Sequence, residues 1–250
     1  MNQRLERLTA RVLEENRCLF LNDSMIAERI LNADKEKRPR IIREAYSKLI
    51  EIDEDSFLVG QYTNVSLLES VKRKGLADEL KALANKYSRY KNRLYIPAGD
   101  HLTADFDYVL KNGISGFVEQ INQMQKTAVG EGQSSFLSEL YFTAQSAIAW
   151  TQAYVDALHN AAQKCTSKKR RAELLQMADI CGKVPYLPAS SFREAIQSYY
   201  FTFILFSHDG MGRLDQYLYP YYINDIHEGI LSRDEALALI EELFIKIFGF

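Results

Sequence analysis

The segment Ser207–Tyr222 reads SHDGMGRLDQYLYPYY, and its composition is unusual for plain scaffold. Two glycines, Gly210 and Gly212, flank a methionine and lead directly into Arg213. Glycine adopts backbone angles that other residues avoid and lets other groups approach the chain closely. We therefore expect a tight structural turn built from these three residues. Such a turn would hold Asp215 in a fixed direction, either toward a ligand or in an ion pair with the neighbouring arginine.

The overall composition is that of a globular chain whose partner is a small molecule or another protein. With 250 residues and 47% hydrophobic content, the chain can bury a sizeable core in one or two domains. Its 31 basic and 33 acidic residues nearly cancel, which gives no basic footprint for nucleic acid. The longest apolar run, near Phe203–Phe206, is too short to cross a bilayer, and the N-terminus lacks the apolar centre of a signal peptide. We therefore predict a cytoplasmic protein without a membrane partner.

The cysteines and histidines show no metal-ligand pattern. Cys18, Cys165 and Cys181 are odd in number and widely spaced, which favours a reducing compartment over a disulfide framework. His159 and His227 lie on predicted helix surfaces without a paired ligand. We predict no metal site.

Apolar periodicity predicts a mainly α protein with a few short strands. The candidate strand is Asp53–Val59, where charged residues give way to apolar ones. The longest predicted helix leaves Trp150 off its apolar stripe. Helical spacing of apolar residues occurs in the ranges Gln3–Glu15, Ile41–Ile50, Leu67–Tyr90, Ile114–Met124, Phe136–Lys164 and Lys168–Ile180.

Capping signals place several helix ends. Asp100 or Thr103 can cap a helix that runs to Lys111 and stops at Asn112-Gly113. The polar run 130–135 predicts a break before the longest helix.

Two capping boxes precede apolar periodic runs, Ser191 with Glu194 and Ser232 with Glu235. They predict the start of a helix that leads into the glycine turn and of a second helix near the end of the sequence.

The run GRLDQYLYPYY, residues 212–222, resembles a signature of the glycyl radical enzymes, the pyruvate formate-lyase-like family of anaerobic lyases and dehydratases. Three further stretches resemble motifs of this family in the same order, at 99–117, 184–195 and 231–246. The resemblance implies the N-terminal part of a ten-stranded α/β barrel. It further implies a single domain over 1–250, in which 95–250 is family-like and 1–94 is a less clearly related helical portion.

The resemblance also implies chemistry that this sequence lacks. In this family, a radical-SAM activating enzyme installs a radical on a backbone glycine, and the radical passes to a cysteine that abstracts hydrogen from the substrate. None of the three cysteines has the family's context, since Cys181 follows an isoleucine and precedes a glycine. The sequences around Gly116 and Gly249 lack the arginine that leads the radical loop. We predict no catalytic residue and no cofactor in this chain.

Two substrate-binding candidates follow from the resemblance, His101 and Asp215. In several dehydratase-like members, these motifs lie near the mouth of the barrel. The alternatives are a capping or packed histidine at a helix start, and an aspartate that caps a helix or pairs with Arg213. Gly210 departs from those members, which carry a substrate-facing serine at this position. For Arg213, we favour a structural role in organising the turn.

The sequence thus predicts a truncated or split glycyl radical enzyme that is inactive alone. Its predicted partners are a second copy or the missing C-terminal portion, and an activating enzyme for the full form. The alternative is a non-catalytic helical interaction or regulatory domain derived from the family. Six tyrosines could stack on nucleic-acid bases, but the charge balance favours packing: Tyr199, Tyr200, Tyr217, Tyr219, Tyr221 and Tyr222.

Overall fold

A computed structural model describes residues 3–14, 19–20, 32–60, 63–64, 103–205 and 210–248. These residues are mainly helical, as predicted. The elements are α1 (Gln3–Glu14), β1 (Leu19–Phe20), η1 (Lys35–Lys37), α3 (Arg38–Tyr46), β2 (Thr63–Asn64), α6 (Phe106–Lys126), α7 (Gly130–Lys164), α8 (Lys168–Lys183), α9 (Phe192–Leu205), α10 (Leu214–His227) and α11 (Arg233–Phe248).

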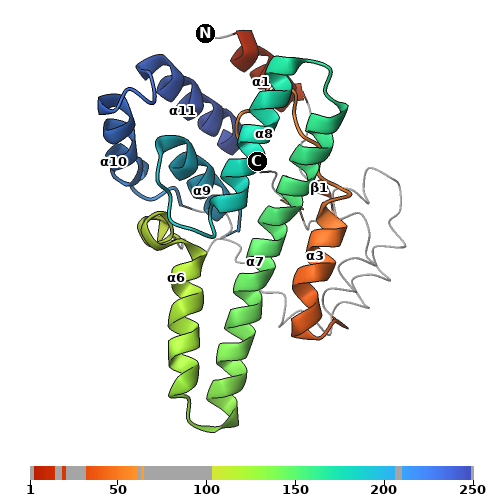
Figure 1. Cartoon of the computed structure of the whole chain (residues 1–250), viewed down its shortest axis with the longest axis vertical. Coiled ribbons are helices and arrows are strands. Elements are labelled where there is room, and N and C mark those ends of the chain that lie inside the picture. Colours follow the sequence, from red (N-terminus) through yellow and green to blue (C-terminus); the bar gives the residue numbers. More distant parts are fainter. Residues whose placement is uncertain are drawn as a thin grey trace.

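The long helix α7 organises the arrangement of the others (Figure 1). Helix α3 and helix α6 pack along it, and α8 folds back against its C-terminal half. Helices α9, α10 and α11 gather at one end of the molecule, where α9 contacts α6, α8, α10 and α11. Within the described ranges, the strands are limited to β1 and β2, which pair in parallel with Leu19 opposite Thr63.

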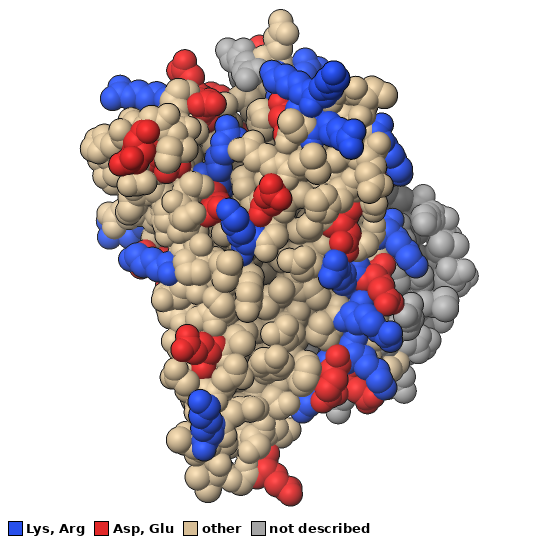
Figure 2. Space-filling model, in the orientation of Figure 1, with Lys and Arg blue, Asp and Glu red and all other residues tan. Residues whose placement is uncertain are grey.

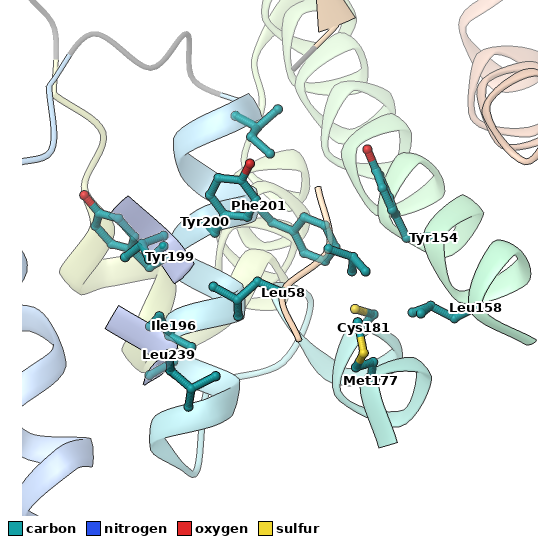
Figure 3. Close-up of a cluster of buried hydrophobic side chains, with 14 of the residues drawn as sticks. Leu58, Tyr154, Leu158, Met177, Cys181, Ile196, Tyr199, Tyr200, Phe201 and Leu239 are labelled. Atoms are coloured by element: carbon teal, nitrogen blue, oxygen red, sulfur yellow. The ribbon is translucent and has the colours of Figure 1, made fainter. Parts of the chain in front are cut away.

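Helix α9 forms the centre of the core. Every residue from Phe192 to Ile204 except Arg193 is buried. Figure 3 shows aromatic and aliphatic side chains of α9 meeting residues from α7 and α8. The Phe201 ring lies 5.4 Å from the rings of both Trp150 and Tyr154. Trp150 is only 5% exposed, although it lies off the predicted apolar stripe.

The segment 53–60 is irregular, and the strand predicted at Asp53–Val59 was wrong. Side chains of the helices bind its backbone in place of a neighbouring strand. The Glu242 carboxylate accepts hydrogen bonds from the N–H groups of Phe57 and Leu58, each at 2.8 Å from Oε1. Gln197 pairs with both the N–H and the carbonyl of Val59.

Two arginines bind the outer carbonyls of the same segment. Arg170 donates to Asp53 O at 2.8 Å and to Ser56 O at 2.9 Å. Arg4 donates to the carbonyls of Asp55 and Ser56. Because buried backbone groups must find hydrogen-bond partners, these helix side chains fix the path of the segment through the core.

Helix α6 corrects one predicted boundary and confirms another. Its N-cap is Asp105, whose side chain accepts a hydrogen bond from Tyr108 N, so neither Asp100 nor Thr103 caps it. The predicted stop at Asn112-Gly113 is confirmed, because Gly113 has non-helical backbone angles with a φ of 66°. Helix α6 therefore consists of two helical pieces that meet at a kink, and the second piece begins at Ile114 as predicted.

The predicted start of the longest helix also needs correction. The polar run 130–135 forms the first turns of α7, which begins at Gly130. Small and polar residues are tolerated at a helix start, where the backbone is solvent-exposed and end effects outweigh propensity.

The two predicted capping boxes differ in their geometry. At α11, the box is complete: Glu235 N donates to Ser232 Oγ at 3.2 Å, and Ser232 N donates to the Glu235 carboxylate at 2.9 Å. At α9, Glu194 N donates to Ser191 Oγ, but the Glu194 carboxylate instead accepts from Ser190 N.

The Phe192 N–H at the start of α9 finds a more distant partner. It donates to the buried Asp225 carboxylate of α10 at 2.8 Å, which ties the start of α9 to the end of α10.

Two sequence predictions lie outside the described residues, the helix at Leu67–Tyr90 and the environment of Cys18. No helix in the described part of the chain is both long enough and apolar enough to cross a membrane. In the same part, no three histidine, cysteine or acidic side chains come together as metal ligands would.

Candidate functional site

The glycine turn that precedes α10 is held from one side by aromatic side chains. Gly212 has a φ of 57°, and a side chain there would meet the Tyr217 ring at 2.9 Å. The Tyr199 hydroxyl of α9 donates to Met211 O at 2.8 Å. The Tyr199 ring stacks on Phe106, with ring centroids 4.4 Å apart. The positive φ and the close contacts favour glycine at position 212, and side chains of α9 and α10 contact the turn.

The hydroxyl of Tyr199 remains a neutral donor over a wide pH range. Burial raises its pKa well above the ordinary value, and the nearby Tyr217 adds to this effect. A neutral phenol keeps the proton that the bond to Met211 requires.

Arg213 and Asp215 take separate positions at the start of α10. Arg213 is the N-cap residue, and its carbonyl accepts from Gln216 N and Tyr217 N. Asp215 is exposed in the first helical turn, where its charge complements the helix dipole. Among the described residues, no ion pair joins the two side chains, and no carbonyl accepts from the Arg213 guanidinium. The observed structural role of Arg213 is therefore that of its backbone, which caps α10.

The other predicted substrate residue, His101, lies outside the described residues. The described chain resumes at Thr103, beside the glycine turn. A side chain on Gly212 would come within 3.1 Å of the Thr103 side-chain methyl. The turn and the segment that follows His101 are therefore neighbours, although the histidine itself is not placed. Gly210 is half-buried at the start of the turn.

The tyrosines of this region divide into buried and exposed groups. Tyr199 and Tyr200 are buried, and the Tyr200 hydroxyl donates to Gly60 O at 3.3 Å. The Tyr221 hydroxyl donates to Leu110 O at 3.1 Å. Tyr219 is 57% exposed and remains available for contact. Packing with satisfied hydroxyl groups thus accounts for three of the six.

The two described cysteines differ in burial. Cys181 is buried in α8 against the core (Figure 3), and burial raises the pKa of its thiol. Cys165 follows α7 and directs its thiol toward Ser167 O at 3.6 Å. His159 and His227 are exposed on α7 and α10.

The sequence did not identify the residues that hold the site together. Tyr199 and Phe106 are 93 positions apart, and an apolar pattern gives no sign that they stack. Asp225 lies three residues after the signature run 212–222, and its bond to Phe192 N spans 33 positions. These contacts depend on how the helices pack, for which a single sequence carries no direct signal.

The chain is similar in sequence to a defined family over nearly its whole length. A family model described as "Pyruvate formate lyase-like" matches residues 5–249. Isethionate sulfite-lyase of Bilophila wadsworthia is 30% identical over 161 residues, which cover 58% of this chain and 19% of that protein. Trans-4-hydroxy-L-proline dehydratase of Clostridioides difficile is 34% identical over 100 residues, which cover 37% of this chain and 13% of that enzyme.

Solved structures share the fold. The glycerol-bound form of the B12-independent glycerol dehydratase from Clostridium butyricum matches with a TM-score of 0.77 at 20% identity, over 98% of this chain and 39% of that chain. A structure that describes 1,2-propanediol dehydration in Roseburia inulinivorans has the same TM-score at 24% identity. The chain spans well under half the length of these relatives. It belongs to the pyruvate formate lyase-like family of glycyl radical enzymes, of which it represents a part.

Proposed function

We propose that this chain supplies the helical, N-terminal part of a glycyl radical enzyme barrel, while the radical machinery resides in polypeptide outside it. The full ten-stranded barrel would then carry out a radical lyase or dehydratase reaction in the cytoplasm. Residues 1–250 would act as one domain, with 95–250 forming its family-like part. The match over 5–249, set against the much greater length of the relatives, supports this division.

The observation that carries the proposal is the burial and the sequence context of the cysteines. A cysteine that abstracts hydrogen must face the substrate, but Cys181 is 1% exposed within a helix of the core. The sequence around each cysteine lacks the family's loop pattern, and no glycine has the family's radical-loop context. We infer that the chain alone neither holds the radical nor turns over a substrate.

The substrate side of the site is proposed to include His101 and Asp215. The proximity of Thr103 to Gly212 supports their grouping, because His101 precedes Thr103 by two residues. Asp215 is exposed on the first turn of α10, where it is free to accept hydrogen bonds from a hydroxylated substrate. Gly210, Gly212 and Arg213 would set the direction of this carboxylate.

The test combines radical detection with identification of a partner. The purified chain is incubated anaerobically with S-adenosylmethionine, a reductant and the radical-SAM activating enzyme of the same cell. Electron paramagnetic resonance should show no glycyl radical on it, whereas a full-length family member treated alike should show one. The tagged chain, recovered from native cells, should bring down a longer family polypeptide that carries the cysteine loop and the radical glycine. A radical on the isolated chain would overturn the proposal, as would the absence of any such polypeptide.

A further inference from the structure

The junction between α7 and α8 carries a dense group of basic residues. Five of the eight residues 164–171 are lysine or arginine, and none is acidic. The whole chain has a net charge of −2 with these five included, so the rest of the chain is acidic on balance. In Figure 2, blue side chains gather at the end of the molecule where Figure 1 places this junction. Positive charge is therefore concentrated at one place on a chain of nearly balanced composition.

Two of the five basic residues have a structural role within the chain. Lys164 lies in the last turn of α7, where a cation complements the helix dipole. Arg170 pairs with Glu173 at 3.0 Å and donates to backbone carbonyls of the segment 53–60. The side chain of Arg170 is only 14% exposed, so this residue belongs to the interior of the molecule.

The other three residues, Lys168, Lys169 and Arg171, form a surface that we call the basic patch. Successive side chains of an α-helix are turned by about 100° around its axis. Because Arg170 is directed inward, the residues on either side of it are directed outward. All three residues of the basic patch are exposed.

The basic patch lacks negative partners within the described part of the chain. Among the described residues, none of its three side chains forms an ion pair or a hydrogen bond. Other exposed cations do find carboxylates: Arg43 pairs with Asp156 at 2.8 Å, and Lys111 pairs with Asp107 at 2.7 Å. The three charges of the patch are therefore available to a partner.

The position of the basic patch in the helix adds to its unfavourable electrostatics. Helix α8 begins at Lys168, and its first turn contains no acidic residue. The N-terminus of a helix carries partial positive charge and favours carboxylates over cations. The like charges of the patch also repel one another. Negative charge supplied from outside the chain would relieve both effects.

We propose that the basic patch is a docking site for an acidic segment of a partner protein, in which several carboxylates lie close together. Each cation of the patch can pair with one carboxylate, and the Arg171 guanidinium can do so through two parallel hydrogen bonds. A protein segment fits better than nucleic acid, because residues 164–171 include no aromatic side chain on which a base could stack. The acidic remainder of the chain would also repel a long polyanion. This docking does not depend on the proposed enzymatic role.

Fluorescence anisotropy of a labelled oligoglutamate peptide, titrated with the whole chain at low ionic strength, tests the proposal. The wild type should bind this peptide more tightly than an oligoglutamine peptide of equal length, and added salt should weaken the binding. The patch variant combines Lys168→Gln, Lys169→Gln and Arg171→Gln. It should raise the dissociation constant of oligoglutamate by about tenfold or more, because three charge pairs are lost together.

A control variant removes the same number of charges elsewhere on the surface. It combines Lys37→Gln, Arg40→Gln and Lys48→Gln, at three exposed positions. Two of these cations already have carboxylate partners, Asp34 and Glu44. The control variant should therefore weaken oligoglutamate binding far less than the patch variant does.

Circular dichroism should show native helix content in both variants, because all six substituted positions are exposed. The proposal would be overturned if the wild type bound oligoglutamate no better than oligoglutamine. Equal weakening by the patch variant and the control variant would also overturn it. A single-stranded oligonucleotide of the same charge is the third probe. If it binds the wild type more tightly than oligoglutamate does, and the patch variant loses that binding, the patch is a nucleic-acid site and the proposal is wrong.

Discussion

Gln197 of α9 forms a double hydrogen bond with the backbone of Val59, accepting from its N–H at 3.0 Å and donating to its carbonyl at 2.7 Å. Both residues are buried, so neither backbone group has water as an alternative partner. A helix side chain thereby performs the role of an adjacent strand.

Gln197→Ala should destabilise the fold by about 2–4 kcal/mol, because it leaves a buried N–H and a buried carbonyl unpaired. Urea unfolding followed by circular dichroism measures this loss. Gln176→Ala on the exposed face of α8 is the matched control and should change the free energy of unfolding by less than about 0.5 kcal/mol. A loss of similar size in both variants would contradict the assigned role.

Glu242 should make stability depend on pH. Burial raises the pKa of its carboxyl above the ordinary 4.5, although Lys246, the N–H donors of Leu58 and Phe57, and Arg4 act in the opposite direction. The folded protein therefore binds this proton more tightly than the unfolded chain does. The resulting stabilisation is complete below pH 4.5 and is lost as the pH rises through the raised pKa.

Glu242→Gln removes this titration, so the free energy of unfolding of the wild type should fall relative to the variant as the pH rises from 4.5. Urea unfolding of both proteins at a series of pH values gives the difference. Glu241→Gln, at the adjacent position, should retain the pH dependence of the wild type. If rising pH instead favours the wild type over Glu242→Gln, the assigned direction is incorrect.

Gly113→Ala should destabilise the protein by on the order of 2–4 kcal/mol. Gly113 has a positive φ, and an added Cβ would approach the backbone of Leu187 at 2.7 Å. Gly132→Ala provides a control of opposite sign, because nothing lies within 4 Å of its Cβ position in α7. Replacing a glycine within a helix by alanine should stabilise by roughly 0.5–1 kcal/mol. Thermal unfolding of the two variants should therefore shift in opposite directions.

Tyr199→Phe should loosen the glycine turn without disturbing the aromatic stack. The variant keeps the ring against Phe106 but removes the bond to Met211 O, at a cost of about 1 kcal/mol. Hydrogen exchange should accelerate locally in residues 210–217. Tyr108→Phe, whose exposed hydroxyl accepts from Gln120, should leave the turn unchanged. Unaltered exchange in Tyr199→Phe would show that the hydroxyl does not hold the turn.

Asp215→Asn tests the proposed role of Asp215 in substrate binding. The variant is assayed in the enzyme reconstituted from this chain and its longer partner. A hydrogen-bonding role predicts a rise in KM of about tenfold, since a bond to a charged group is worth about 1.5–3 kcal/mol. Asp234→Asn is a close structural match, because both aspartates are exposed in the first turn of a helix. Both variants should lose a similar, small amount of stability through the helix dipole. An equal effect on KM would leave Asp215 with a structural role only.

The features that the sequence predicted well are local ones. Ser232 and Glu235 are three residues apart, and their reciprocal capping depends on little beyond that spacing. The predicted stop at Gly113 is confirmed by its non-helical backbone angles, and distant carbonyls accept from the N–H groups that follow it: Ile114 N donates to Pro185 O, and Ser115 N donates to Tyr186 O. The strand prediction failed, since side chains from four helices, α1, α8, α9 and α11, bind the backbone of the segment in place of a neighbouring strand.

The candidate site shows the same division. The glycine turn could be located from its composition, and the positive φ of Gly212 agrees with it. The contact of Tyr199 with this turn could not be predicted from the sequence, because it depends on the packing of α9 against α6. Trp150 is buried away from the predicted stripe because its ring contacts both Tyr46 of α3 and Phe201 of α9, so the buried surface of α7 is wider than one stripe.

The way in which the segment 53–60 is bound has a consequence for how this protein tolerates mutation. Arg4, Arg170, Gln197 and Glu242 all bind main-chain atoms, which every amino acid except proline provides in full. Codons in the segment can therefore drift among residues of compatible size and shape. Substitutions of the four helix residues should be tolerated less, because each removes hydrogen bonds to the main chain of the segment, although Arg4 and Arg170 share Ser56 O. The path of this irregular segment therefore depends more on the surrounding helices than on the side chains of the segment itself.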